Sequence, residues 1–139
     1  MIAIRYPEPS DKDFWFSLDQ HLALSEFEDK VQRKMGYILE IDGKPVGVLR
    51  FNLFWDEIPF CNLLCVNHDH HKNGYGKKIM AFWEMDMKHR GYDLLMTSTQ
   101  VDESAQHFYR RLGFEGSGSL LFNSPKYKQP MELIMVKEI

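Results

Sequence analysis

Short runs of apolar residues, bounded by turn residues, recur along the chain and predict β-strands. Apolar and polar side chains alternate over 2–6, and Pro7, which has no N–H to donate to a sheet ladder, ends this first run. Two more runs, 37–41 and 46–51, flank Asp42-Gly43, a dipeptide typical of hairpin turns. The pattern therefore predicts a first strand and, later, a β-hairpin.

Residues 60–66 form the most continuous apolar run and lack the alternation of a half-exposed strand. Such a run is typical of a strand covered on both faces. Cys61 and Cys65 would then share one face, about 13 Å apart at ~3.3 Å per residue, which is too far for a disulfide. We expect two buried free thiols, which fit a reducing cytoplasm.

Two later segments carry apolar residues at helical spacing and end at glycines. In the first, 77–90, these residues are Ile79, Met80, Trp83 and Met87. In the second, which ends at Gly113, they are Ala105, Phe108, Tyr109 and Leu112. Each segment is predicted to be a helix that buries one face.

Near the N-terminus, two short helices are indicated by their start signals. Ser10 and Ser25 each precede an acidic residue by three positions, the pattern in which the serine caps the first amides of a helix. We expect helices at 10–23 and 25–35, the second ended by Gly36.

The last strands are expected at 93–99, 119–122 and 131–136. The predicted order is then β-α-α-β-β-β-α-β-α-β-β, an α/β (α+β) arrangement with a mixed sheet and helices packed on both faces.

Composition agrees with one globular domain spanning residues 1–139, since 44% of the residues are hydrophobic and 27% charged. The formal net charge of −3 argues against a nucleic-acid-binding surface or a polybasic membrane anchor. The chain also shows neither the pattern of a signal peptide nor an apolar run long enough to span a membrane. We expect a cytoplasmic protein.

The loop 67–76 joins the apolar strand to the first predicted long helix and is the strongest candidate for chemistry. Gly74 and Gly76 allow a tight turn with unobstructed N–H groups, and Lys77 and Lys78 place positive charge at the positive end of the helix dipole. A bound phosphate would resolve that conflict. The alternative is an ordinary glycine-containing loop with solvated lysines, because G-x-G alone is a weak motif.

A second segment, 102–114, follows the next strand, and the two segments together resemble the GCN5-related N-acetyltransferase (GNAT) family. The coenzyme A loop of that family reads V-x-P-x-x-[RQ]-x-x-G-x-[GA], and its later helix reads N-x-x-A-x-x-x-Y-x-x-x-G-F. The matching residues are Val66, Gly74, Gly76, Ala105, Tyr109, Gly113 and Phe114. The chain departs from the patterns at three positions. The family usually has Pro in place of His68, Arg or Gln in place of His71, and Asn in place of Asp102.

The resemblance implies a mostly antiparallel sheet of about seven strands and acetyl-coenzyme A as the acetyl donor. By analogy with the family, backbone groups of the central strand pair with the pantetheine arm and the loop holds the diphosphate. The coenzyme-binding residues implied are Leu64, Cys65, Val66, His71, Lys72, Asn73, Gly74, Tyr75, Gly76, Lys77, Ala105 and Phe108. Tyr109 matches the tyrosine that acts on the departing sulfur; the alternative is a tyrosine that only packs in the core.

The implied activity is direct acetyl transfer to a primary amine of a small molecule or a peptide. A non-catalytic acyl-coenzyme A-binding module is the alternative, since His71 and Asp102 alter the coenzyme contacts. The general base stays open among Glu57, Asn62 and His68. A homodimer fits the family, and we expect no metal, because adjacent histidines in 68–71 cannot all converge on one ion.

The acceptor side is less defined by the sequence. Asp19, Glu26, Glu28 and Asp29 crowd the two early helices and could attract a cationic amine, although carboxylates of helix starts and solvated faces are the simpler interpretation. Phe54 and Trp55 could wall an acceptor pocket or merely pack at a hairpin tip.

Overall fold

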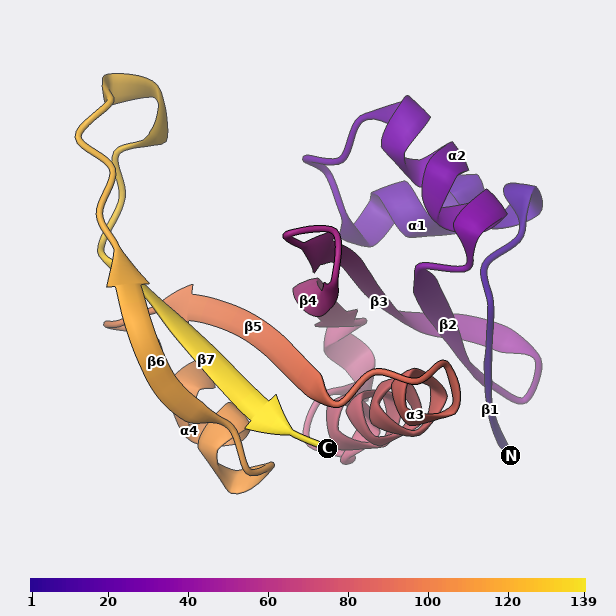
Figure 1. Ribbon diagram of the computed structural model, residues 1–139. Helices are drawn as coiled ribbons and strands as arrows, with labels where there is room; N and C mark the ends of the chain where they lie inside the picture. Colours follow the sequence, from indigo (N-terminus) through magenta and orange to yellow (C-terminus); the bar gives the residue numbers. More distant parts are fainter.

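The computed structural model describes all 139 residues, which form a seven-stranded sheet and four α-helices (Figure 1). The strands are β1 (Ile2–Arg5), β2 (Gly36–Ile41), β3 (Lys44–Phe54), β4 (Ile58–Val66), β5 (Leu94–Gln100), β6 (Glu115–Leu120) and β7 (Glu132–Glu138). The α-helices are α1 (Lys12–Leu18), α2 (Leu24–Arg33), α3 (Tyr75–His89) and α4 (Ala105–Arg111). The predicted order of elements is confirmed.

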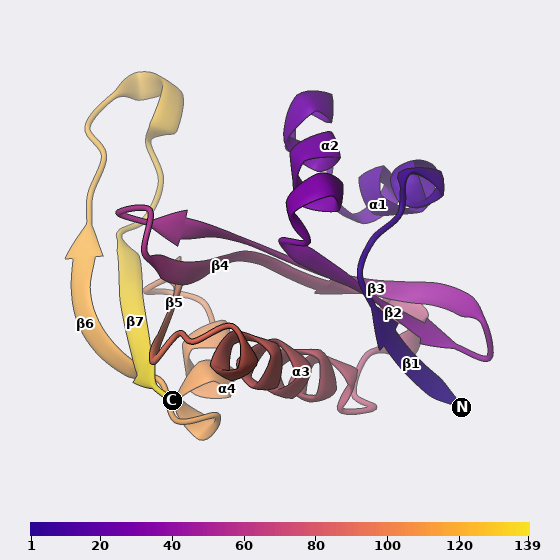
Figure 2. The same ribbon diagram turned by 45° about the vertical axis from the view of Figure 1, so that its right-hand side comes forward.

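The sheet is mixed and mostly antiparallel, as expected. Its strand order is β1-β2-β3-β4-β5-β7-β6, and β4 and β5 form the one parallel pair. Helices α1 and α2 cover one face of the sheet, and α3 and α4 cover the other (Figure 2). The predicted α+β sheet with helices on both faces is therefore confirmed.

Strands β4 and β5 separate soon after they meet. Their pairing consists of Phe60 opposite Met96 and Cys61 opposite Thr97. Beyond Cys61, β4 runs on to Val66 without a partner on its β5 side. The centre of the sheet therefore opens into a cleft, which positions the candidate site.

Two hydrophobic clusters hold the helices on the sheet. The apolar stripe predicted for α3 is buried, and it packs with sheet residues in the larger cluster. On the other face, Trp15 of α1 meets Phe27 of α2 edge to face with ring centroids 5.3 Å apart, above Ile38 and Val48. Burial of such large side chains stabilises both layers.

The second early helix lies close to its predicted bounds, but the predicted capping serines of both helices are wrong and the first helix is shorter than expected. A 3₁₀ turn, Pro9–Asp11, precedes α1, and there Asp11 rather than Ser10 caps, by accepting a hydrogen bond from the Glu8 N–H at 2.7 Å. The N-cap of α2 is Ala23, and Ser25 lies inside the helix. Helix α1 ends at Leu18, and α2 ends at Arg33, followed by Lys34 in the left-handed conformation.

Gly36 belongs to β2 rather than to the end of α2. A Cβ atom at this position would lie 2.8 Å from Cη2 of Trp15 and 2.9 Å from the Leu49 carbonyl oxygen. The glycine therefore serves a close approach of α1 to the sheet, which the sequence alone does not reveal.

Two expectations about β4 are also corrected. The strand is largely half-buried, and Asn62 is exposed, because the cleft leaves part of it uncovered. The register with β3 shifts between Arg50/Leu63 and Phe51/Cys61, so Asn62 forms a β-bulge. The extra residue turns Cys61 and Cys65 to opposite faces, although both are free thiols as expected.

Strands β6 and β7 continue into an arm, residues 121–131, that projects beyond the sheet (Figures 1 and 2). Strand β6 begins at Glu115, earlier than predicted, and every residue of it is exposed. None of the helices combines the length and the apolar character needed to cross a membrane.

Candidate active site

A groove of about 680 Å³ runs from the free edge of β4 to the first turns of α3 and α4. Its lining consists of Leu64, Val66, His70, His71, Lys72, Gly74, Tyr75, Gly76, Lys77, Ser104, Ala105, Phe108 and Tyr109. The structure thus brings together the two sequence motifs. Of the residues that the sequence associates with the coenzyme, Cys65 and Asn73 lie outside this lining.

The loop before α3 presents a run of unused backbone donors to one end of the groove. Lys72 and Gly74 both have positive φ, at 66° and 75°, which folds the chain tightly into the helix. None of the N–H groups from Lys72 to Lys77 donates within the chain, and the first that does is Lys78, to the Gly74 carbonyl at 3.1 Å. Consecutive free amides at a helix N-terminus, with Lys72 and Lys77 beside them, have the chemistry to bind an anion.

The side chain of His71 lines the groove and also contacts the end of β4. Its Nε2 lies 2.8 Å from the Val66 carbonyl oxygen, and since a carbonyl can only accept, the ring is the donor. The His68 ring meets the His71 ring edge to face at 5.1 Å. In this structure His71 links the loop to the end of β4 through its Nε2 atom.

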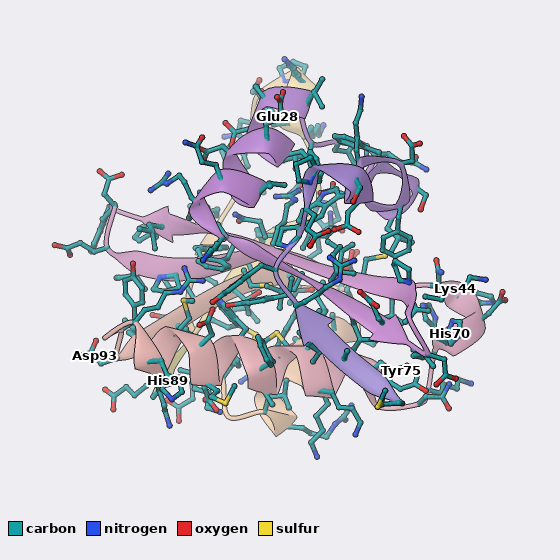
Figure 3. All side chains as sticks on the ribbon, turned by 90° about the vertical axis from the view of Figure 1, so that its right-hand side faces the viewer. Glu28, Lys44, His70, Tyr75, His89 and Asp93 are labelled. Carbon is teal, nitrogen blue, oxygen red and sulfur yellow. The ribbon has the colours of Figure 1, made fainter.

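The opposite wall of the loop is formed by His70 and Tyr75, whose ring centroids are 6.3 Å apart. Both residues lie at one edge of the protein, far from Glu28 on α2 (Figure 3). No group of three or more His, Cys, Asp or Glu side chains converges in the structure.

The free edge of β4 offers backbone groups to a ligand in the groove. The Asn67 N–H donates to the Val46 carbonyl at 2.7 Å, and the same register pairs Cys65 with Val48. Because antiparallel residues alternate between bonded and non-bonded pairs, the polar groups of Cys65 face β3 and those of Leu64 and Val66 face the cleft. The backbone groups directed toward the groove are therefore those of Leu64 and Val66, and the Val66 carbonyl already contacts His71 Nε2.

A second cavity, of about 570 Å³, opens on the other side of the cleft between β4, β5, β7 and the arm. Its lining consists of Phe60, Cys61, Asn62, Leu63, Leu64, Thr97, Ser98, Thr99, Gln100, Glu103, Ala105, Tyr109, Leu120, Phe122, Gln129, Glu132 and Ile134. Leu64, Ala105 and Tyr109 line both cavities. The groove and this second cavity, which we call the β7 pocket, meet at these side chains.

Tyr109 stands at the junction, on the buried side of α4. Its side chain is only 8% exposed, and its ring packs against Phe108 and Phe114. Burial raises the pKa of the Tyr109 hydroxyl, and the neighbouring Cys61 adds to that rise. The hydroxyl is thus protonated at neutral pH and is able to donate a hydrogen bond.

Cys61 lies beside this hydroxyl but is chemically inert. Burial raises the pKa of its thiol to about 12, so almost no thiolate forms near neutrality. Its carbonyl accepts a hydrogen bond from Thr97 Oγ1 at 3.2 Å, which ties β4 to β5 at the point where they part. A covalent route through Cys61 is disfavoured on these grounds.

Glu103 and Glu132 are the charged side chains of the β7 pocket. Glu103 accepts a hydrogen bond from Thr99 Oγ1 at 3.4 Å, and Glu132 accepts one from Gln129 Nε2 at 3.2 Å. Sequence reasoning missed both residues. The only signal for Glu132 was a charge near the start of the last predicted strand.

Among the residues considered as a general base, Asn62 lines the β7 pocket and donates to Asn52 Oδ1 at 2.7 Å. Glu57 and His68 line neither cavity. Phe54 and Trp55 stack on each other at 4.7 Å, and Trp55 is 75% exposed at the hairpin tip, so they do not wall the pocket.

The acidic residues of the early helices are also placed away from the cleft. Asp19 is only 2% exposed, and it accepts hydrogen bonds from Trp15 Nε1 at 3.1 Å and Arg50 Nε at 2.6 Å. Glu26 and Asp29 line a separate cavity of about 290 Å³ beside α2. Asp19 is thus a structural carboxylate, and none of these acids lines the β7 pocket.

Comparison with known proteins connects this geometry to a family. Residues 4–114 match the model of the acetyltransferase (GNAT) family. No curated protein sequence gives a significant match.

Several solved structures share the fold over nearly the whole chain. The ribosomal-protein-S18-alanine N-acetyltransferase from Escherichia coli superposes with a TM-score of 0.84 at 18% identity, covering 100% of this chain and 94% of that one. Ard1 from Thermoplasma volcanium gives a TM-score of 0.86 at 15% identity, with 99% and 97% covered. The N-acetylglutamate synthase from Neisseria gonorrhoeae, complexed with coenzyme A and N-acetyl-glutamate, gives 0.81 at 17% identity, covering 99% of this chain and 35% of the synthase.

Proposed function

Because the chain belongs to the acetyltransferase (GNAT) family, we propose that it is an acetyl-coenzyme A-dependent N-acetyltransferase that transfers the acetyl group directly to a primary amine of a small molecule or a peptide. The observation that carries the proposal is the meeting of two cavities at Tyr109. One cavity has the chemistry to hold a polyanionic thioester, and the other is open to a second reactant.

The groove fits the donor in charge and in backbone chemistry. Acetyl-coenzyme A carries about four negative charges near neutral pH, given phosphate second ionisations near 6. The free amides from Lys72 to Lys77 would hold the diphosphate, and the side chains of Lys72 and Lys77 would add positive charge. Leu64 and Val66 would bind the pantetheine arm as if it were an extra strand, which directs the thioester to Tyr109.

Positioning is the main contribution of the protein to the reaction. The bound donor would supply an activated thioester carbonyl and a thiol leaving group. The cleft would place the acceptor nitrogen next to that carbonyl, so that the N–C bond forms as the C–S bond breaks. The amine loses one proton, and the sulfur gains one.

Tyr109 would act on the departing sulfur. Reference pKa values near 10 for a phenol and 8.5 for a thiol make full proton transfer uphill by about 2 kcal/mol. Burial raises the pKa of Tyr109 and makes early transfer harder still. We therefore assign to the hydroxyl a strong hydrogen bond to the sulfur in the transition state, with the proton moving late.

The test is thiol release on mixing the protein with acetyl-coenzyme A and a panel of primary amines. Amine-dependent release, together with an acetylated product of the expected mass, would support the proposal. A non-catalytic acyl-coenzyme A-binding module is the second candidate, favoured by the hydrogen bond that His71 Nε2 makes with the Val66 carbonyl. Saturable coenzyme A binding with no release across the panel would select that module.

A further inference from the structure

The charges of the β7 pocket define the class of acceptor, an inference that rests on the proposed function. We infer that the acceptor is a primary amine on an apolar carbon chain, with no carboxylate beside the amine, and that Glu132 binds its ammonium group before the proton is lost. The pocket, not the early helices, is the place where the amine is recognised.

The first observation is the one-sided charge of the lining. Glu103 and Glu132 contribute two carboxylates, and no Lys, Arg or His side chain lines the pocket. Arg50 stands opposite Leu63 on the neighbouring strand, but Asp19 holds it in a 2.6 Å ion pair. A carboxylate on the acceptor would find no cationic partner and would face two like charges.

The second observation is an apolar wall beside Glu132. Leu120 and Phe122, at the base of the arm, line the pocket yet are 48% and 45% exposed. Ile134 of β7 continues this wall two residues from Glu132. Apolar side chains exposed in a cavity gain from contact with an apolar ligand, so the part of the acceptor beyond its nitrogen is hydrophobic.

Glu132 is the better placed of the two carboxylates to receive the amine. It pairs with Gln100 of β5 on one side and with Leu120 of β6 on the other. Glu132 therefore lies between a polar residue and the apolar wall. Glu103 lies just before α4, whose N-cap is Ser104, and its charge contributes to the raised pKa of the Tyr109 hydroxyl. Gln129 donates to Glu132 and leaves the remaining carboxylate lone pairs for an ammonium group.

The experiment compares matched acceptors that differ only in a carboxylate: leucine with leucinamide, and phenylalanine with phenylalaninamide. kcat/KM is measured for each by thiol release from acetyl-coenzyme A, in the wild type and in Glu132→Gln. The two members of a pair differ in amine basicity, which affects their reactivity with any enzyme. The informative quantity is therefore the amide-to-acid ratio of kcat/KM in Glu132→Gln divided by the same ratio in the wild type, because the intrinsic reactivity cancels. Glu138→Gln is the control, because Glu138 is exposed on the same strand and outside the pocket.

We expect the wild type to prefer the amides, and Glu132→Gln to reduce that preference by about tenfold, mainly through KM, whereas Glu138→Gln leaves it unchanged. An unchanged ratio in Glu132→Gln, or a wild-type preference for the free amino acids, would overturn the inference while leaving the proposed acetyltransferase in place. Absence of thiol release with every amine would overturn the proposed function, and this inference with it.

Discussion

Replacing Tyr109 with phenylalanine removes one oxygen atom at the junction of the two cavities and keeps the aromatic ring. The ring contacts to Phe108 and Phe114, at centroid distances of 5.2 and 5.8 Å, are preserved. The fold and the affinity for coenzyme A should therefore change little. What is lost is the hydrogen bond that the hydroxyl would donate to sulfur as charge develops there.

The size of the effect follows from the protonation state of Tyr109. Because burial raises its pKa, the hydroxyl is a neutral donor throughout the neutral range. A hydrogen bond to a charged partner contributes about 1.5–3 kcal/mol. At about 1.4 kcal/mol for each factor of ten, kcat of Tyr109→Phe should fall by roughly 10- to 150-fold.

The assay is steady-state thiol release at saturating acetyl-coenzyme A, with coenzyme A binding measured separately by calorimetry. Tyr92→Phe is a matched control, since Tyr92 packs on the core cluster and lines neither cavity. A kcat of Tyr109→Phe equal to that of the wild type would refute the role of the hydroxyl. Tyr109 would then be a core tyrosine only.

Three further predictions concern backbone strain, close packing and acid stability. Gly74→Ala should lower the free energy of unfolding by about 1 kcal/mol and weaken coenzyme A binding, because φ is 75° at this position. Space is not the cause, since a Cβ atom at Gly74 would meet no atom within 4 Å. Gly118→Ala has equal space and no positive φ, so it should change neither quantity in denaturation and binding measurements. Gly36→Ala should cost about 1–3 kcal/mol in denaturant unfolding, since its Cβ would lie 2.8 Å from the Trp15 ring, and wild-type stability would contradict the close approach. Burial acts to raise the pKa of Asp86, but hydrogen bonds from two tyrosines and an arginine outweigh it and leave the pKa lowered. The Asp86 carboxylate therefore stabilises the fold at pH values above its unfolded pKa near 3.9, and this stabilisation is lost as the pH falls through its folded pKa. Asp86→Asn should lower Tm at pH 7 and flatten the decline of Tm below about pH 4.

The matched acceptor comparison tests a different property from Tyr109→Phe. The tyrosine substitution is expected to reduce kcat for every amine, because sulfur is common to all reactions of the donor. The Glu132 substitution is expected to change the ranking of amines, because the carboxylate meets only the acceptor. Together the two variants separate the chemical step from acceptor recognition.

Much of the fold was predictable from the sequence because its signals are local. The stripe Ile79, Met80, Trp83 and Met87 repeats with the period of a helix, and all four side chains are buried in the core. Gly74 marked the tight turn before α3, where the structure places a positive φ that glycine adopts without strain. The motif around Tyr109 pointed to the family that the comparison over residues 4–114 then showed.

Features that depend on contacts between distant segments were not predictable. The bulge at Asn62 arises from the register with β3, and it alone decides that Cys61 and Cys65 face opposite sides. The commitment of Asp19 to Arg50 and of His71 to the Val66 carbonyl likewise depends on how separate elements pack. The sequence shows which groups these side chains carry. Which partner each group meets is decided by the packing of distant segments.

The sequence by itself determined the order of elements, the buried face of α3 and the residues that can surround an anion, since these follow from spacing within one segment. The tertiary structure decided that β4 and β5 part after Cys61 and that Glu132 reaches the resulting pocket from the far end of the chain. The physical reason is that a cavity forms where packed surfaces separate. Its charge is then set by side chains from strands that are neighbours only in the folded sheet.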